Sequence, residues 1–317
     1  MATIYYPTTA VVQQRQVSGS TLTEQFIGVL PDQILVFTGS TFFTSSLTAS
    51  YAYTSSNAYT ASYLVGGTRT MLTGNTTWYV HPTGSDSNNG LSLSTPFRTI
   101  QKGVDIASSV DTVIYNITLQ LADGAHTGSV SIKPRVGAGT LTIQGNLANS
   151  SSVNWYSSGS FNNLICDAQT TSVIKNIRFT STATAIYCRL GWTVDIYNSI
   201  FGACTNTHLV AFQGGIIKLV TDYEIDGPAV YHIQTFTSGI VACVTRNVKI
   251  KNTPAFSVFI WCYLGGIVQY SGNTFNGSAT GARYDISGNG VVDTGGGGAT
   301  YLPGNSAGAI ATGGQYL

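Results

Sequence analysis

The segment Ile174-Lys175-Asn176-Ile177-Arg178-Phe179 decides the fold, because variants of it recur further along the chain. These variants occupy residues 196–201, 220–225, 245–250 and 270–275, and the last residues of successive copies are 22 to 25 positions apart. A repeat of this length is typical of a solenoid, in which each unit buries its apolar face by stacking on its neighbours.

Each repeat also contains short runs rich in β-branched and aromatic residues, for example residues 215–220, 239–244 and 256–263. A repeat of about two dozen residues leaves little room for a strand with a crossover helix, but it suits three short strands and three turns. The period therefore predicts that each repeat forms one coil of a parallel β-helix, and the fold class is all-β.

One column of the repeat admits only amide, aspartate and glycine residues. Its members stand three positions before the end of each copy and are Asn176, Asn198, Asp222, Asn247 and Gly272. These residue types tolerate the left-handed backbone conformation that a sharp turn between strands requires. We expect them to form a structural turn ladder along the axis of the helix.

The sequence before the repeats predicts a strand and a turn-rich loop over residues 78–90, followed by a capping helix near 96–108. Thr95 is a suitable N-cap and Pro96 suits the first helical position. The apolar residues Phe97, Ile100, Val104 and Ala107 fall on one helical stripe, which would cover the open end of the β-helix.

Three parts of the chain differ in character. Residues 76–298 are expected to form the β-helix. Residues 1–75, rich in Thr, Ser, Ala and Tyr, are expected to be a small N-terminal attachment, stalk or oligomerisation segment. Residues 299–317 follow a run of four glycines and are expected to form a C-terminal tail or cap.

The composition limits the kinds of partner. Only 9% of residues are charged, and 14 basic against 13 acidic side chains give a net charge of +1. Nucleic acid binds through clustered Lys and Arg, so we expect no nucleic-acid partner. No run approaches the roughly 20 consecutive apolar residues of a spanning helix, so we expect no membrane insertion.

The five cysteines are scattered and form no Cys-x-x-Cys pair. We interpret them as small buried hydrophobic residues of a protein made in a reducing cytoplasm, rather than as disulfides or metal ligands. The four histidines are scattered as well. We expect no metal site and no cofactor.

The densest group of carboxylates is Asp222 and Glu224, with Asp195 one coil earlier. On a strand, Asp222 and Glu224 would share a face roughly 6 to 7 Å apart, which suits a catalytic pair for glycoside hydrolysis. The structural interpretation is favoured, because Asp222 belongs to the turn column and Glu224 shares an outward column with Arg178 and Lys249. Ion pairs between coils then suffice to explain these charges.

Aromatic side chains are the better candidates for binding, because they stack on sugar faces and lose little entropy when held rigid. The candidates for a glycan surface are Trp155, Trp192, Trp261, Tyr231 and Tyr263. The alternative for each of them is a place in the core or in an interface between subunits.

The stretch from Tyr79 to Lys102, including Ser94-Thr95-Pro96-Phe97-Arg98-Thr99-Ile100, resembles the opening signature of right-handed parallel β-helix proteins of the pectate-lyase-like type. It is most similar to the versions in bacteriophage tailspikes and tail fibres. The echo of Thr48–Tyr51 in Thr60–Tyr63 and the tail from Tyr301 to Tyr316 also resemble phage structural sequences. The resemblance implies a virion protein, a homotrimer, whose N-terminal segment contacts other virion proteins.

The favoured function is therefore a phage virion structural protein that presents a β-helix for attachment to host surface glycans. One alternative is enzymatic, a polysaccharide depolymerase of the tailspike type that uses Asp222 and Glu224. The other is purely architectural, a head fibre, decoration or collar protein. The chain is expected to act on the particle after synthesis in the host cytoplasm.

Overall fold

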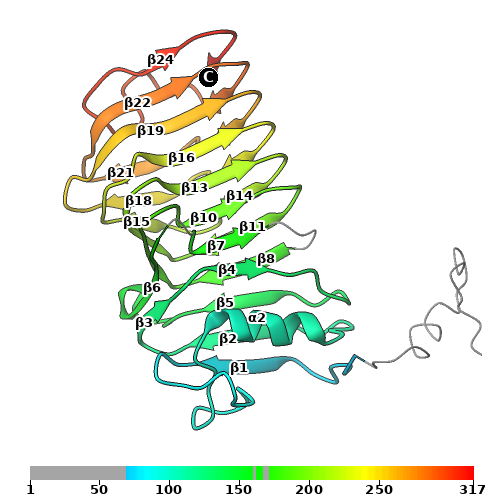
Figure 1. Cartoon of the computed structure of the whole chain (residues 1–317). Coiled ribbons are helices and arrows are strands. Elements are labelled where there is room, and N and C mark those ends of the chain that lie inside the picture. Colours follow the sequence, from blue (N-terminus) through cyan, green and yellow to red (C-terminus); the bar gives the residue numbers. More distant parts are fainter. Residues whose placement is uncertain (1–68, 160–161, 167–170) are drawn as a thin grey trace, which may run out of the picture. The chain divides into compact units, whose positions relative to one another are not determined.

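A computed structural model describes residues 69–317 apart from 160–161 and 167–170. This part of the chain is a parallel β-solenoid of about 8 turns, which confirms the predicted β-helical architecture. Figure 1 shows the coils stacked from β1 at one end to β24 at the other. Of the predicted N-terminal segment, residues 1–75, residues 1–68 lie outside the described part of the chain.

The coils contribute strands to three sheets, and all strand pairs within the sheets are parallel. Sheet 1 consists of β1 (Thr76–Val80), β2 (Ile117–Leu121), β5 (Leu141–Gln144), β8 (Thr171–Lys175), β11 (Thr193–Tyr197), β14 (Ile216–Leu219), β17 (Ile240–Ala242), β20 (Ile267–Gln269), β23 (Val291–Asp293) and β25 (Gln315–Tyr316). Sheet 2 consists of β3 (Gly124–Thr127), β6 (Val153–Ser157), β9 (Arg178–Ser181), β12 (Ile200–Cys204), β15 (Tyr223–Ile225), β18 (Asn247–Ile250) and β21 (Thr274–Asn276). Sheet 3 consists of β4 (Val130–Ile132), β7 (Leu164–Cys166), β10 (Ile186–Cys188), β13 (Thr207–Phe212), β16 (Tyr231–Phe236), β19 (Ala255–Tyr263), β22 (Thr280–Ile286) and β24 (Ala309–Ile310).

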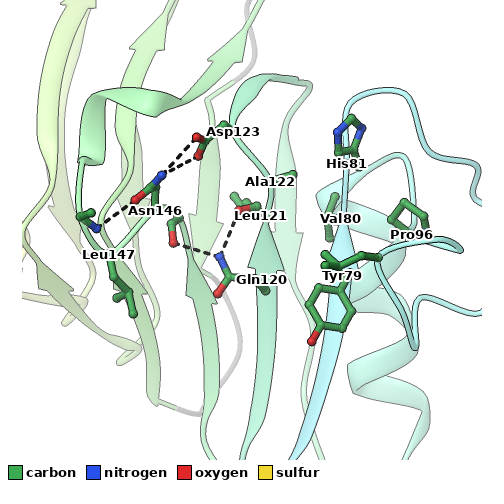
Figure 2. A pocket seen from close by; sticks show the side chains of 13 residues that line it. Tyr79, Val80, His81, Pro96, Gln120, Leu121, Ala122, Asp123, Asn146 and Leu147 are labelled. Carbon is green, nitrogen blue, oxygen red and sulfur yellow. Dashed lines mark hydrogen bonds between the residues drawn. The ribbon is translucent and has the colours of Figure 1, made fainter.

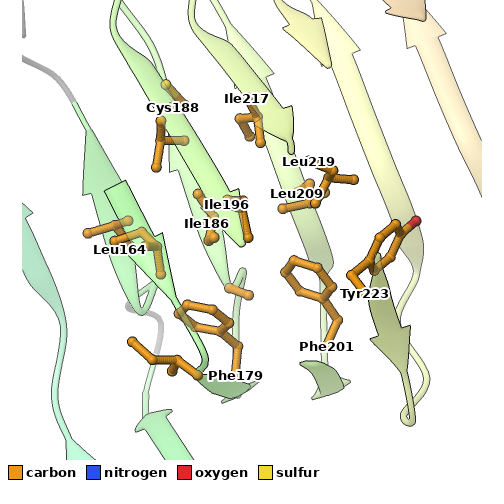
Figure 3. Close-up of a cluster of buried hydrophobic side chains, with 14 of the residues drawn as sticks. Leu164, Phe179, Ile186, Cys188, Ile196, Phe201, Leu209, Ile217, Leu219 and Tyr223 are labelled. Carbon is orange, nitrogen blue, oxygen red and sulfur yellow. The ribbon is translucent and has the colours of Figure 1, made fainter. Parts of the chain in front are cut away.

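The core fills the space enclosed by the three sheets. Alternate residues of most strands point inward. The ring of Phe179 lies 5.6 Å from Trp155 and 5.9 Å from Phe201. Phe201 in turn meets Tyr223 edge to face at 5.7 Å, so the rings of successive coils form a column (Figure 3). Burying each such side chain contributes about 1.5–3 kcal/mol, and none of these faces could be buried by one coil alone.

The register confirms most of the predicted repeat. Phe179 pairs with Phe201, Phe201 with Ile225, and Ile225 with Ile250. The last predicted copy is displaced, because Phe275 pairs with Val248 rather than with Ile250. The turn after β18 contains two consecutive residues with positive φ, Asn252 and Thr253, and lengthens that coil.

Three of the five residues in the predicted turn column have the expected left-handed backbone conformation. Asn176, Asn198 and Gly272 have φ values of 55°, 45° and 68°, as the left-handed turn requires. Asp222 and Asn247 do not have positive φ. Asn247 is the first residue of β18, and the left-handed residue of the turn before that strand is Thr245, with a φ of 57°. Asp222 and Asn247 still connect coils, since the backbone N and the Nδ2 of Asn247 donate to the Asp222 carboxylate at 2.9 and 3.0 Å.

The capping helix begins later than predicted. Helix α2 (Ile100–Ser109) has Thr99 rather than Thr95 as its N-cap, and Phe97 forms a parallel bridge with Val80 instead of a helical turn. The Asp86 carboxylate fixes this start by accepting hydrogen bonds from the backbone N–H groups of Arg98 and Thr99.

Helix α2 packs against β1, β2 and β4 through four buried residues, Ile100, Gly103, Val104 and Ala107. Gly103 allows a close approach, because a Cβ there would lie 3.0 Å from the Leu119 side chain. A short 3-10 helix, η1 (Ser150–Ser152), precedes β6. In the part of the chain that the structure describes, no helix is long and apolar enough to cross a membrane.

The segment 299–317, expected as a tail or cap, adds strands to the solenoid. β24 pairs with β22 and β25 pairs with β23. The backbone N–H and the hydroxyl of Thr294 also donate to the carbonyl oxygen of Leu317. These contacts place the last residues of the chain on the final coil.

Candidate functional site

Six half-buried aromatic side chains lie on the outer surface of sheet 3, and we call this group the aromatic face. Its members are Tyr187 on β10, Phe212 on β13, Tyr231 and Phe236 on β16, and Trp261 and Tyr263 on β19. Their positions alternate with the buried residues of the same strands, which face the core. The aromatic face therefore runs across four neighbouring coils.

The rings of the aromatic face contact one another in a continuous series. Phe212 stacks on Phe236 with 4.4 Å between ring centroids, and Trp261 stacks on Tyr231 at 5.2 Å and on Tyr263 at 5.7 Å. Tyr187 lies 6.4 Å from Phe212, and Phe236 lies 6.4 Å from Trp261. The rings support one another, so the surface loses little entropy when a ligand binds.

Strand register explains why the rings meet. Phe212, Phe236 and Tyr263 are successive partners in the parallel ladder, and neighbouring strands are about 4.8 Å apart. In β16 the alternation of inward and outward residues is interrupted, because the neighbours His232 and Ile233 are both buried. Tyr231 therefore also points outward. Cross-strand aromatic pairs of this kind stabilise a sheet by about 0.2–1 kcal/mol each.

Polar side chains border the aromatic face. Gln234 and Asp285 occupy the positions paired with Trp261 on the two neighbouring strands. At the other end, the Arg189 guanidinium lies 5.9 Å from the Tyr187 ring centroid. The surface thus combines flat apolar rings with an amide, a carboxylate and a guanidinium, which can orient the hydroxyl groups of a ligand.

The structure brings together three of the five aromatic residues selected from the sequence, namely Trp261, Tyr231 and Tyr263. Trp155 and Trp192 were wrongly placed on a binding surface, because both are fully buried in the core. The Trp155 indole N–H donates to the Gly128 carbonyl at 2.9 Å, which allows this polar atom to be buried.

Tyr187, Phe212 and Phe236 belong to the aromatic face but were missed by the sequence analysis. A signal for two of them exists in the sequence, since Phe212 and Phe236 are 24 residues apart and thus occupy the same place in successive repeats. Whether that place faces outward depends on the strand alternation, which only the coil geometry reveals.

The carboxylates proposed for catalysis are held in ion pairs or hydrogen bonds. The Glu224 carboxylate lies 3.3 Å from Lys249 Nζ and 2.6 Å from Lys251 Nζ, so the expected pairing between coils is present. Hydrogen bonds from Asn247 lower the pKa of Asp222. A general acid needs a raised pKa, and the hydrogen bonds to Asp222 favour its charged form instead.

Asp195 lies apart from the other two. It belongs to β11 in sheet 1, where its neighbours in the ladder are Val173 and Lys218, whereas Glu224 belongs to β15 in sheet 2. Two positions after Glu224, Asp226 is paired with Arg178, whose Nε and Nη2 lie 3.1 and 3.0 Å from the carboxylate oxygens. The fold does not bring Asp195 and Glu224 together on one strand face.

A polar network lies inside the core, away from both surfaces. The Nδ1 atoms of His208 and His232 are 2.9 Å apart, and the Tyr223 hydroxyl lies 2.9 Å from His232 Nε2. Burial lowers the pKa of His208 to about 3. Among the residues that the structure describes, no group of His, Cys, Asp and Glu side chains is arranged to hold a metal ion.

The chain was compared with known proteins. No family model matches it, and no match was found among curated proteins or among solved structures.

Proposed function

We propose that this chain is a phage virion structural protein, tail-fibre or tailspike-like, whose solenoid presents the aromatic face to a neutral glycan on the host surface. The observation that carries the binding part of this proposal is the unbroken series of six aromatic rings over four coils. The virion part rests on the resemblance of residues 79–102 to the opening of phage β-helix proteins.

A glycan suits this surface for physical reasons. Pyranose rings have apolar C–H faces that pack on aromatic rings, and their hydroxyl groups need hydrogen-bond partners at the edge. Gln234 and Asp285 supply such partners on both sides of Trp261. A chain of neutral sugars extended along the solenoid axis would meet similar rings in successive coils.

The proposal is binding without cleavage. The carboxylate of Glu224 is paired with two lysines and that of Asp226 with Arg178, so both are engaged in pairs that stabilise the fold. Incubation of the protein with host polysaccharide should therefore release no new reducing ends. Their appearance, and their loss in Glu224→Gln, would instead support the tailspike-type depolymerase.

The second candidate for the aromatic face is another copy of this chain. Aromatic residues are enriched in protein interfaces, and a homotrimer is what the resemblance implies. In that case the face would be covered in the particle and the chain would be architectural, as in a head fibre, decoration or collar protein. The same variants distinguish the two occupants.

The test compares the double variant Trp261→Ala/Tyr263→Ala with Tyr197→Ala, a control on sheet 1 whose ring lies under Lys175. Binding to an array of neutral bacterial polysaccharides is measured together with the mass by light scattering. We expect the double variant to bind at least about tenfold more weakly, a change of about 1.4 kcal/mol, with its mass unchanged. If the variant loses its oligomeric state, or if its glycan binding equals that of wild type, the proposed role of the aromatic face is wrong.

A further inference from the structure

A groove of about 430 Å³ opens on the first coils, far along the chain from the aromatic face. It lies between the end of β1, the loop that contains Leu93 and Pro96, and the turns that follow β2 and β5. Figure 2 shows Asp123 and Asn146 on one side of it and Tyr79 and His81 on the other. The volume is within the range of small-molecule sites.

The polar side of the groove is rigid. Asn146 Nδ2 donates to both Asp123 carboxylate oxygens at 2.9 and 3.1 Å. Asn146 Oδ1 in turn accepts from the backbone N–H groups of Ala148 and Asn149 at 2.9 and 3.1 Å. A carboxylate has about four acceptor positions, so Asp123 keeps positions for hydroxyl donors of a ligand.

The opposite side supplies a donor. The backbone N–H of Thr83 donates to His81 Nδ1 at 3.1 Å, which makes that nitrogen an acceptor. In the neutral ring the proton then belongs to Nε2, which has no hydrogen-bond partner among the described residues. His81 can therefore donate one hydrogen bond into the groove that it lines.

Apolar groups complete the groove. The ring of Tyr79 is half-buried, while Leu93 and Leu147 are 75% and 68% exposed. Exposed leucines beside an aromatic ring leave apolar area that a ligand with an apolar face can cover. The lining contains no Lys or Arg, and its one charged side chain is acidic, which disfavours phosphate or another anion.

We propose that this groove is a separate glycan-binding site that takes a single neutral pyranose ring, such as the terminal residue of a chain. Two neighbouring hydroxyl groups of the sugar donate to Asp123, a ring or hydroxyl oxygen accepts from His81 Nε2, and the apolar face of the sugar packs on Tyr79. This site does not depend on the aromatic face, and either one can exist without the other.

The test uses the full chain and a panel of methyl pyranosides that differ in the orientation of one hydroxyl group. Saturation-transfer NMR identifies the sugars that bind, and titration calorimetry compares wild type with Asp123→Asn and Tyr79→Ala. Tyr115→Ala, on the turn before β2, is the matched control. We expect both groove variants to bind at least about tenfold more weakly, while Tyr115→Ala and Trp261→Ala/Tyr263→Ala bind as wild type does.

A second measurement needs no variant. The bound sugar should shift the methyl NMR signals of Leu93 and Leu147, which flank the groove, and leave those of Ile217 in the core unchanged. The proposal is overturned if no methyl pyranoside in the panel binds at millimolar concentration, or if binding leaves both leucine signals in place. It is equally overturned if Asp123→Asn and Tyr79→Ala, shown to be folded by circular dichroism, bind as tightly as wild type.

Discussion

The Nδ1 atoms of His208 and His232 lie 2.9 Å apart in the closed interior of the solenoid, where both side chains are fully buried. Only one proton fits between the two nitrogens, so a second proton on Nδ1 of either ring breaks this hydrogen bond and leaves a charge in the core. Aromatic rings surround the pair, since Phe201, Phe256 and Phe259 all contact His232. The pair therefore favours the uncharged form of both rings.

The first prediction is that acid destabilises the fold through this pair. Burial lowers the pKa of His208 to about 3 and that of His232 well below its usual value of 6.5. The unfolded chain then binds more protons than the folded chain below pH 6.5, so the stabilisation is complete above that pH. It is lost progressively as the pH falls from about 6.5 towards 3.

Thermal unfolding monitored by circular dichroism between pH 7.5 and 4 measures this effect. We expect Tm to fall with pH in wild type, and to fall less steeply in His208→Gln/His232→Gln, which cannot take up these protons. Part of the slope should remain, because burial also lowers the pKa of His126. An identical pH dependence in wild type and the double variant would show that the pair does not control acid stability.

The second prediction concerns the ion pair between Arg178 and Asp226. It connects two coils that are separated by one further coil. The side chains are only 27% and 16% exposed, and a Cβ on Gly202 would lie 2.8 Å from Arg178 Nη2. Asp226→Asn leaves the guanidinium without its charge partner and should lower the free energy of unfolding by about 1–3 kcal/mol. Chemical denaturation measures this change.

Lys249→Met is the control for this prediction. The Lys249 side chain is 56% exposed, and Glu224, which is 14% exposed, keeps Lys251 as a partner when Lys249 is lost. We therefore expect a change of only about 0–1 kcal/mol. Equal losses of unfolding free energy in Asp226→Asn and Lys249→Met would contradict the distinction drawn between the half-buried Arg178 and the exposed Lys249.

The third prediction concerns the left-handed turn at Asn198, whose φ is 45°. Asn198→Ala should lower the free energy of unfolding by roughly 1–2 kcal/mol, because a Cβ without a local polar group disfavours this conformation. Asn198→Gly should be less harmful, since glycine adopts positive φ without steric cost. If the two variants prove equally stable in urea denaturation, backbone strain is not what selects asparagine at this position.

The fourth prediction is that the five cysteines do not react in the folded protein. All five are buried, and burial raises the pKa of Cys204 and of Cys243 to about 12. The thiolate is the reactive form, so a thiol reagent at pH 8 should label the protein only after unfolding. Rapid labelling of any cysteine without denaturant would contradict this burial.

Much of the fold follows from local sequence. The spacing of the motif that ends at Phe179, Phe201, Ile225 and Ile250 predicts the stacked coils, because only a stacked arrangement buries an apolar face that recurs every two dozen residues or so. The cysteines were likewise expected to be buried, and they are. The charges on Glu224 and Lys249 were expected to pair between coils, and they do.

The displaced pairing of Phe275 with Val248 could not be read from the motif, because the lengthened turn at Asn252 and Thr253 lies between two copies of it. The start of α2 was also misjudged. Thr95 and Pro96 form a sound local signal, but Phe97 bridges to Val80, and the hydrogen bonds of Arg98 and Thr99 to Asp86 place the start of the helix after Thr99.

The sequence by itself determined that this chain winds into parallel coils, since a recurring apolar pattern and residues able to adopt positive φ are local properties. The tertiary structure alone decided which aromatic rings face outward, as Trp155 and Trp192 fill the core while Phe212, Phe236 and Tyr263 align on sheet 3. The physical reason is that two consecutive inward residues, such as His232 and Ile233, interrupt the alternation along a strand. Every following side chain then lies on the other face of the strand.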